Sequence, residues 1–296
     1  MQANKINLKK SLNKAYFKQA IKRSDIESLK SGICKLFQRI NDKEFEENQK
    51  NIISDLLKET WYSPRFEINT KDRIDLAIHN GKTSKDTVGV IIEIKRPSSP
   101  ERMTSENLNC KALHELILYY FDERNENKNT QVKHLVASNV YDWFIFDENE
   151  FDKIFYRNTR LQKLYKSKVE QGKDNPFFYS EAQKIVAEIE DEIYCTHFNI
   201  KDYENAAANA DQADDERLIE LFKILSPEHL LKLAFANDSN SLNKEFYSEL
   251  LHIIGLEEFK DGGKKIINRK KPENRDDGSL LENTINTLQS EDCVDA

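Results

Sequence analysis

The sequence predicts an α/β fold, in which a mixed β-sheet is flanked by helices and further helices extend both ends of the chain. Two patterns of apolar residues support this prediction. Over residues 66–95 and 132–146 they alternate or form short branched runs, and elsewhere they recur every three or four positions. Together the patterns give the order α-β-β-β-α-β with one strand more, which is typical of a sheet covered by helices.

The composition is that of a globular chain with a polar surface. Hydrophobic residues make up 38% and charged residues 33% of the 296 positions, and the formal net charge is -7. No run approaches the ~20 consecutive apolar residues that span a bilayer, and the first residues lack the apolar block of a secretory signal. The four cysteines form no CxxC pair, so no zinc site or disulfide framework is expected. We expect a cytoplasmic protein without a membrane partner.

Four segments follow from the patterning. Residues 1–44 are predicted to be a helical, basic N-terminal extension, 45–150 the mixed α/β core, 151–260 a helical region, and 261–296 a linker with a short terminal helix. No acidic residue precedes Asp25, whereas lysines and an arginine are spread over the positions before it. The extension is therefore predicted either to follow a phosphate backbone or to be a solvated helix face.

The core begins with an amphipathic helix over 45–61, which carries Glu46 and Glu47 in its first turn. Asn80-Gly81 lies in a loop that joins two strands as a hairpin. The elements expected after the first helix are strands at 66–68, 73–78 and 88–95, a helix at 107–124, and strands at 132–137 and 143–146.

After residue 150 the apolar spacing is helical. A basic cluster from Lys264 to Lys271 is assigned no site, because a linker explains it equally well. Glycines and charged residues predict linkers at 261–263 and 269–278. The expected helices are at 180–193, 215–225, 227–235, 243–254 and 280–288.

The hairpin places three chemically useful side chains on one face. In the strand at 73–78 the apolar residues share one side, which leaves Asp75 on the other. In the strand at 88–95 the same alternation leaves Glu93 and Lys95 together. Antiparallel pairing about the loop brings Asp75 close to Glu93. Two carboxylates and an amine are therefore expected to project the same way.

These residue types predict metal-assisted phosphodiester hydrolysis. Hard cations prefer oxygen ligands, so we expect Asp75, Glu93 and the Ile94 carbonyl to bind Mg²⁺, with Mn²⁺ as an alternative. Such an ion binds a phosphate oxygen and lowers the pKa of an attacking water. Lys95 would orient or deprotonate that water and balance the developing charge, and Arg96 would contact phosphate. The simpler alternative is a solvent-facing hairpin that carries a salt bridge.

Asp75 followed by Glu93-Ile94-Lys95, at the end of a hydrophobic strand and within this element order, resembles the PD-(D/E)XK nuclease superfamily. The resemblance implies a restriction-endonuclease-like core at 45–150. It also implies that Asp75, Glu93 and Lys95 are catalytic.

Two flanking elements extend this resemblance. Glu47 is similar to the acid on the family's first helix, which implies a catalytic role, and Glu46 is its rival for that role. Glu115 and Tyr119 resemble the Gln-x-x-x-Tyr element that follows the lysine in many such nucleases, which implies substrate binding. Glu stands here in place of Gln, and the spacing is equally that of a surface pair on a helix.

Segments 67–97, 111–120 and 139–147 resemble the N-terminal nuclease region of type IIG restriction enzymes, which fuse a nuclease to an adenine-N6 DNA methyltransferase. The resemblance implies a Mg²⁺-dependent DNA endonuclease of a restriction-modification system. Its implied partners are DNA, a separate methyltransferase or specificity subunit, and a transient second copy. There is no Gly-rich cofactor loop, and 174–178 has Phe where the methylation motif requires its second Pro. We expect a fragment, a truncated product or a stand-alone relative without methyltransferase and target-recognition domains.

Two other functions stay open at this stage. A nuclease core without its specificity parts would serve as a non-catalytic DNA-binding or assembly module. A repair nuclease or a ribonuclease would carry the same residues, because a phosphate-cleaving site does not show which sugar it meets.

Overall fold

The computed structural model describes residues 2–42, 44–209, 215–233, 244–261, 264–275 and 278–290. The chain divides into two compact units, Met1–Asn237 and Asp238–Ala296, and each is described by itself. Within the described residues no helix is long and apolar enough to cross a membrane.

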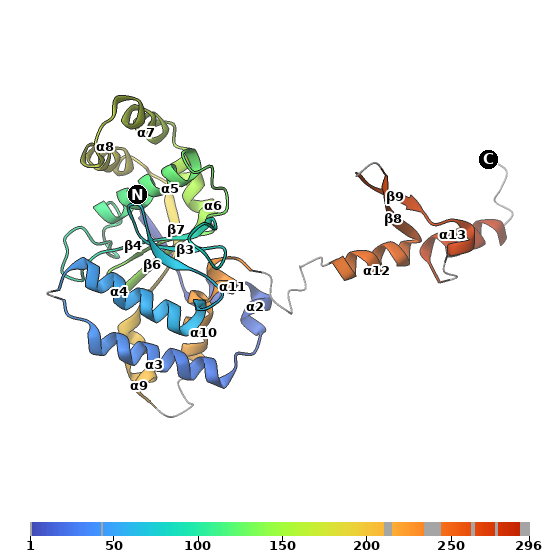
Figure 1. The fold of residues 1–296 in the computed structure, drawn as a ribbon, viewed down its shortest axis with the longest axis horizontal. Helices are drawn as coiled ribbons and strands as arrows, with labels where there is room; N and C mark the ends of the chain where they lie inside the picture. The colour runs from blue at the N-terminus through green and yellow to red at the C-terminus, as the bar shows by residue number, and fades with distance from the viewer. Residues whose placement is uncertain are drawn as a thin grey trace. The chain divides into compact units, whose positions relative to one another are not determined.

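The described part of the first unit is built around a mixed sheet of seven strands, in the order β1-β7-β6-β5-β4-β3-β2 (Figure 1). β1 pairs in parallel with β7 and β4 with β5, and the other neighbours are antiparallel. The predicted order of a helix, three strands, a helix and two strands is confirmed. The strands are β1 (Gln2–Ile6), β2 (Ile68–Lys71), β3 (Ile74–His79), β4 (Val88–Ile94), β5 (His134–Ser138), β6 (Asp142–Asp147) and β7 (Glu192–Asn199).

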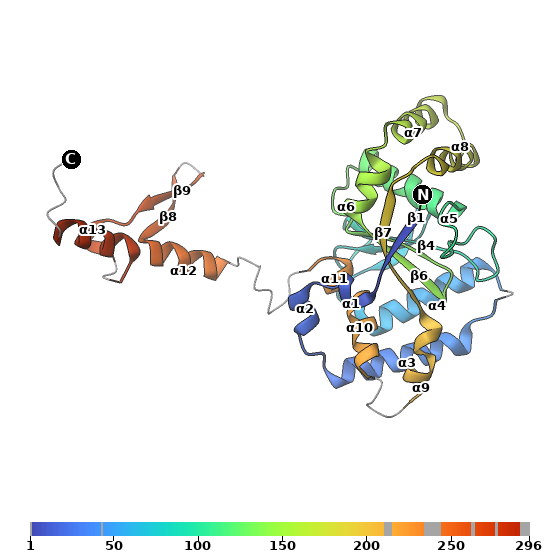
Figure 2. The same ribbon diagram turned by 180° about the vertical axis from the view of Figure 1, so that it is seen from behind.

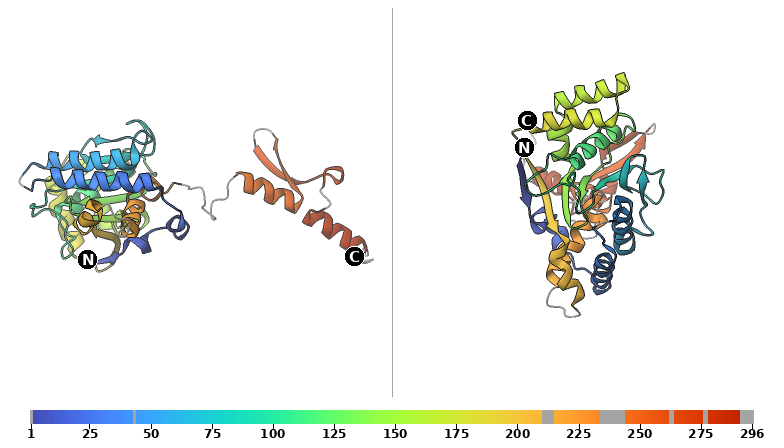
Figure 3. Two further views of the ribbon diagram at one scale, coloured as in Figure 1. Left: turned by 90° about the horizontal axis from the view of Figure 1, so that it is seen from below. Right: turned by 90° about the vertical axis from the view of Figure 1, so that its left-hand side faces the viewer.

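Helices cover both faces of the sheet and form a hydrophobic core on each (Figure 3). Because strand side chains alternate, Val90 and Ile92 of β4 lie in the first core and Ile91 in the second. Burial on both faces explains why β3 and β4 are buried along their whole length. The first core includes α1 (Leu8–Ser11), α2 (Lys14–Lys18), α3 (Arg23–Arg39), α4 (Glu46–Leu57), α9 (Glu204–Ala208), α10 (Asp215–Leu225) and α11 (Pro227–Leu230), and the second α5 (Lys111–Asn125), α6 (Glu148–Phe151), α7 (Thr159–Gln171) and α8 (Asn175–Ala187).

Helix α4 corresponds to the first helix predicted for the core. Glu46 and Glu47 lie in its first turn, where negative charge is favoured by the helix dipole. Ile53 and Leu57 are fully buried against the sheet and against α3, which runs beside α4 (Figure 3). The helix continues into a π-helical turn, Lys58–Tyr62. This packing fixes the first turn of α4 near the ends of β3 and β4.

Two segments that were predicted to be helical contain strands. β1 lies within 1–44 and pairs with β7, which lies within 151–260 (Figure 2). β1 has a polar sequence at the edge of the sheet, so its strand conformation follows from pairing with β7 and not from its own pattern. The helix predicted at 180–193 ends earlier, at Ala187, because the alternation around Ile193 belongs to β7.

A buried lysine ties the N-terminal extension to the first unit. Lys223 of α10 is 1% exposed, and its ammonium group donates to the carbonyl oxygens of Tyr16, Phe17 and Gln19 at 3.0, 2.7 and 2.6 Å. These carbonyls surround the C-terminus of α2, where a positive charge is favoured. The extension is therefore part of the first unit and does not form a separate arm.

The second unit contains α12 (Lys244–Ile254), the antiparallel strands β8 (Leu256–Asp261) and β9 (Lys264–Arg269), and α13 (Leu280–Ser290). Gly255 follows α12 with a φ of 87°, a left-handed conformation that favours glycine. α13 confirms the helix predicted at 280–288, whereas β8 and β9 form a hairpin where the end of the helical region and a linker were predicted. Residues 262 and 263 of the predicted linker, and the end of the helix predicted at 227–235, lie outside the described residues.

Candidate metal centre

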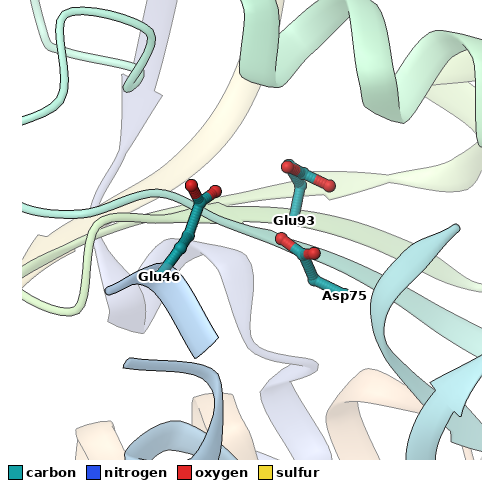
Figure 4. Close-up of side chains that lie close together, drawn as sticks. All are labelled: Glu46, Asp75 and Glu93. Atoms are coloured by element: carbon teal, nitrogen blue, oxygen red, sulfur yellow. The ribbon is translucent and has the colours of Figure 1, made fainter. Parts of the chain in front are cut away.

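Three carboxylates meet near the end of β4 (Figure 4). Glu46, Asp75 and Glu93 each offer an oxygen, and these oxygens lie within 4.8 Å of one another. Glu46 comes from the first turn of α4, Asp75 from β3 and Glu93 from β4. A hard divalent cation prefers such a set of carboxylate oxygens.

Asp75 occupies the place that the hairpin pattern predicted. Leu76 pairs with Ile92, so Asp75 lies next to Glu93. One oxygen of Asp75, Oδ2, accepts the backbone N–H of Ile94 at 2.8 Å. Its other oxygen, Oδ1, lies 2.7 Å from the ammonium group of Lys50. The predicted register of the two strands is confirmed.

Lys95, directly after β4, joins three carboxylates from three elements. Its Nζ lies 2.9 Å from Glu46, 2.6 Å from Glu93 and 2.8 Å from Glu115, and its side chain is 6% exposed. Burial by itself would lower the pKa of Lys95, but Glu93 and Glu115 raise it above the ordinary lysine value. Lys95 is therefore held as a cation.

Glu93 is the most deeply buried member of the cluster, at 1% exposure. Burial raises the pKa of its carboxyl group well above the usual range, Asp75 and the adjacent Glu115 carboxyl raise it further, and Lys95 lowers it. Its Oε2 is buried without a hydrogen-bond partner among the described residues. A buried polar atom without a partner costs free energy, so a ligand at this oxygen would be favourable.

Lys50, on α4, belongs to the cluster although the sequence analysis did not select it. Its Nζ lies 2.7 Å from Asp75 and 3.3 Å from Glu47. Burial by itself would lower the pKa of Lys50, but hydrogen bonding and the charge of Asp75 raise it. The signal in the sequence was the spacing of four residues from Glu46, which places both side chains on one face of the helix.

The charges of the cluster do not balance. Counted as ionised, Glu46, Asp75, Glu93 and Glu115 carry four negative charges, and Lys50 and Lys95 carry two positive ones. The raised pKa of Glu93 favours a proton on this carboxyl group when no cation is bound, and a bound cation would displace that proton. The residues present fit Mg²⁺ or Mn²⁺ in ligand type and in their excess of carboxylates over lysines.

The structure brings Glu46, and not Glu47, into the cluster. The side chain of Glu47 is 70% exposed and contacts Lys50, whereas that of Glu46 is 35% exposed and contacts Lys95. Consecutive residues of a helix point in directions about 100° apart, so only one of the two reaches the sheet. Of the two rivals on this helix, Glu46 lies in the cluster and Glu47 outside it, and a catalytic role for either residue stays a prediction.

Glu115 and Tyr119 both lie near the cluster on α5. Glu115 is buried and ion-pairs with Lys95, so it is not a surface residue. Burial raises the pKa of Tyr119, and Glu93 and Glu115 raise it further. Burial also raises the pKa of Tyr179 on α8 to about 12, with further contributions from Glu115 and Glu93. Tyr179 gave no signal in the sequence, because it is far from the other residues along the chain.

Three other expectations stand as follows. Ile94 contributes its backbone N–H to Asp75, and the role of its carbonyl as a metal ligand stays a prediction. Arg96 lies half-buried in the turn after β4, and its contact with phosphate stays a prediction. The basic segment before Asp25 includes β1, and three strands lie between β1 and β4 in the sheet. Contact of this segment with a phosphate backbone stays a prediction.

Fold and site define an α/β protein with a cluster of carboxylates and lysines at the end of its central sheet. Residues 6–238 match the domain of unknown function DUF7149, so the chain belongs to that family. Residues 239–296 match a second domain of unknown function, DUF7814, and the two matches meet where the structure divides into its two units. No curated protein and no solved structure matches the chain.

Proposed function

We propose that the protein is a Mg²⁺-dependent DNA endonuclease of PD-(D/E)XK type, which acts in the cytoplasm as part of a restriction-modification system. The observation that carries the proposal is the set of three carboxylate oxygens within 4.8 Å of one another, with Lys95 against two of them. The resemblance of segments 67–97 and 111–120 to type IIG nuclease regions supports DNA as the substrate.

Glu46, Asp75 and Glu93 would hold the cation, and the Ile94 carbonyl is a further proposed ligand. When bound, Mg²⁺ or Mn²⁺ supplies Lewis-acid stabilisation of a phosphate oxygen and lowers the pKa of a bound water. The partnerless Oε2 of Glu93 and the excess negative charge support a cation at this place.

Lys95 stabilises the negative charge that develops on the phosphate as the water oxygen attacks phosphorus and the bond to the sugar oxygen breaks. The surrounding carboxylates raise the pKa of Lys95. This direction favours a role as a fixed cation over the alternative of accepting a proton from the water. Glu46, the most exposed of the three carboxylates, is proposed to orient the attacking water, whose proton passes to solvent, while the leaving sugar oxygen takes a proton from solvent.

The proposed partners follow from the same site. Arg96, half-buried after β4, is proposed to contact the DNA phosphate. Glu115 and Tyr119 are buried on α5, so their proposed contribution to substrate binding acts through Lys95, with which Glu115 pairs. The described part of the chain holds one such cluster.

Cleavage of both strands calls for two active sites, so a transient second copy is proposed. A separate methyltransferase or specificity subunit would provide protection of host DNA.

The proposal is tested by plasmid cleavage with wild-type protein, Asp75→Asn and Lys95→Gln, in Mg²⁺, Mn²⁺ or EDTA. We expect metal-dependent nicking or linearisation by the wild type, slowed about 100-fold or more in each variant because a ligand or a charge-stabilising cation is lost. Circular dichroism and thermal unfolding show whether each variant is folded.

Full activity in both folded variants would contradict the proposal. DNA binding by the wild type without cleavage in any metal would instead favour the non-catalytic module. Parallel reactions with single-stranded DNA and RNA distinguish a restriction nuclease from a repair nuclease or a ribonuclease.

A further inference from the structure

We propose that Lys50 occupies a ligand oxygen of Asp75 in the metal-free protein and releases it when the cation binds. Lys50 would thereby set the affinity of the site for metal, and the released ammonium group would then contact the phosphate backbone. This inference rests on the proposed function, and it assigns a positioning role to a residue outside the predicted motif.

Asp75 is the one ligand of the three whose two oxygens are each bound by a separate donor in the described structure. Oδ2 accepts the N–H of Ile94 at 2.8 Å, and Oδ1 pairs with Lys50 at 2.7 Å. Glu93 has the opposite arrangement, because its Oε2 has no hydrogen-bond partner among the described residues. The Oε2 of Glu93 is therefore available to a cation that enters the cluster, whereas Oδ1 of Asp75 is already paired with Lys50.

Lys50 and a divalent cation compete for the same oxygen. The side chain of Lys50 is 18% exposed, so solvent screens the repulsion between the two positive charges only in part. Each therefore weakens the binding of the other at Asp75, and the coupling is reciprocal. Since α4 is fixed by its buried apolar face, the flexible stem of Lys50 is the part that moves.

Glu47 provides a second partner for the released ammonium group. Its Oε2 lies 3.3 Å from Lys50 Nζ, and its side chain is 70% exposed. Lys50 can thus leave Asp75 and stay paired at the rim of the site. A phosphate that arrives at this rim would meet a cation already oriented by Glu47. This gives Glu47 a supporting role although it does not reach the metal ligands.

The experiment measures Mn²⁺ binding to the full chain without DNA, by titration calorimetry and by the paramagnetic resonance signal of free Mn²⁺. The variants are Lys50→Met, Lys50→Gln as a second variant without the charge, and Lys50→Arg. Lys35→Met is the matched control, because Lys35 forms an exposed ion pair with Glu59 at 2.7 Å. We expect Lys50→Met and Lys50→Gln to lower the Kd for Mn²⁺ about tenfold, while Lys50→Arg and Lys35→Met stay near the wild type.

In cleavage assays at saturating metal we expect Lys50→Met to raise the KM for DNA and to change kcat less. If the wild type binds Mn²⁺ and both uncharged variants bind it no more tightly, Lys50 does not compete with the cation. The proposed function would then stand without this inference. Absence of Mn²⁺ binding by the folded wild type would overturn the proposed metal-dependent function together with this inference.

Discussion

At the scale of single residues, the chemistry depends on which side chains reach a space a few ångströms wide. Glu46 and Glu47 are neighbours with the same functional group, yet one contacts Lys95 inside the cluster and the other is 70% exposed. The difference follows from helical geometry, since one residue along a helix turns the side chain by about 100°. The two glutamates therefore provide a matched pair for mutation.

We predict that Glu46→Gln slows metal-dependent plasmid cleavage about 100-fold and weakens Mn²⁺ binding, because the amide removes one negative ligand. Glu47→Gln is expected to change the cleavage rate less than about threefold, because Glu47 acts only through Lys50. Initial rates of both variants at equal metal concentration measure the difference. An equal loss of cleavage rate in Glu46→Gln and Glu47→Gln would contradict the placement of Glu46 alone among the metal ligands.

At the scale of elements, α11 is held against the sheet by a pair of histidines. The rings of His134, on β5, and His229, on α11, lie 4.9 Å apart, and His134 Nδ1 lies 2.8 Å from the carbonyl oxygen of Leu230. Burial lowers the pKa of His134 from 6.5 to about 4. Burial also lowers the pKa of His229, and His134 lowers it further. Both histidines are therefore buried as neutral rings.

These pKa directions predict that the contribution of the two histidines to the free energy of unfolding decreases as the pH falls from about 6.5 to 4. In this window the unfolded chain binds protons that the folded protein excludes, so acid favours unfolding. The contribution of His134 is at most about 1.4 kcal/mol per pH unit. Urea unfolding at several pH values, in the wild type and in His134→Gln, measures it. We expect a shallower dependence in the variant, and an identical slope would show that His134 is not the titrating group.

At the scale of the whole molecule, the candidate site and both hydrophobic cores belong to the first unit. Every described residue of the two cores lies at or before residue 233, and all members of the metal cluster lie before residue 116. The two family matches meet at the same place as the two units. The first unit thus contains both cores and every residue of the proposed metal site.

We predict that a chain of residues 1–237 unfolds cooperatively, with a Tm within about 2 °C of the corresponding transition of the full chain. Its Kd for Mn²⁺ should agree within about twofold, because no cluster residue is removed. Calorimetry and Mn²⁺ titration of both chains provide the comparison. A Tm lower by more than about 5 °C would mean that the second unit contributes to the core.

The central elements could be predicted because their patterns are local and strong. The apolar alternation of β3 and β4 indicated both the strands and their register, and the helical spacing of α4 and α5 indicated the helices on either side. β1 and β7 were missed for different reasons. β1 is a polar edge strand, and β7 begins so soon after α8 that its alternation was taken as the end of a helix.

The sequence by itself determined that Asp75, Glu93 and Lys95 share one face of a hairpin, because alternation along a strand is a local property of the backbone. Only the tertiary structure decided that Glu46 rather than Glu47 completes the carboxylate set, that Lys50 binds Asp75, and that Glu115 pairs with Lys95. These contacts depend on how α4 and α5 pack on the sheet. That packing is set by the buried apolar residues of both cores, and some of these, such as Leu221 and Phe155, lie far from the site along the chain.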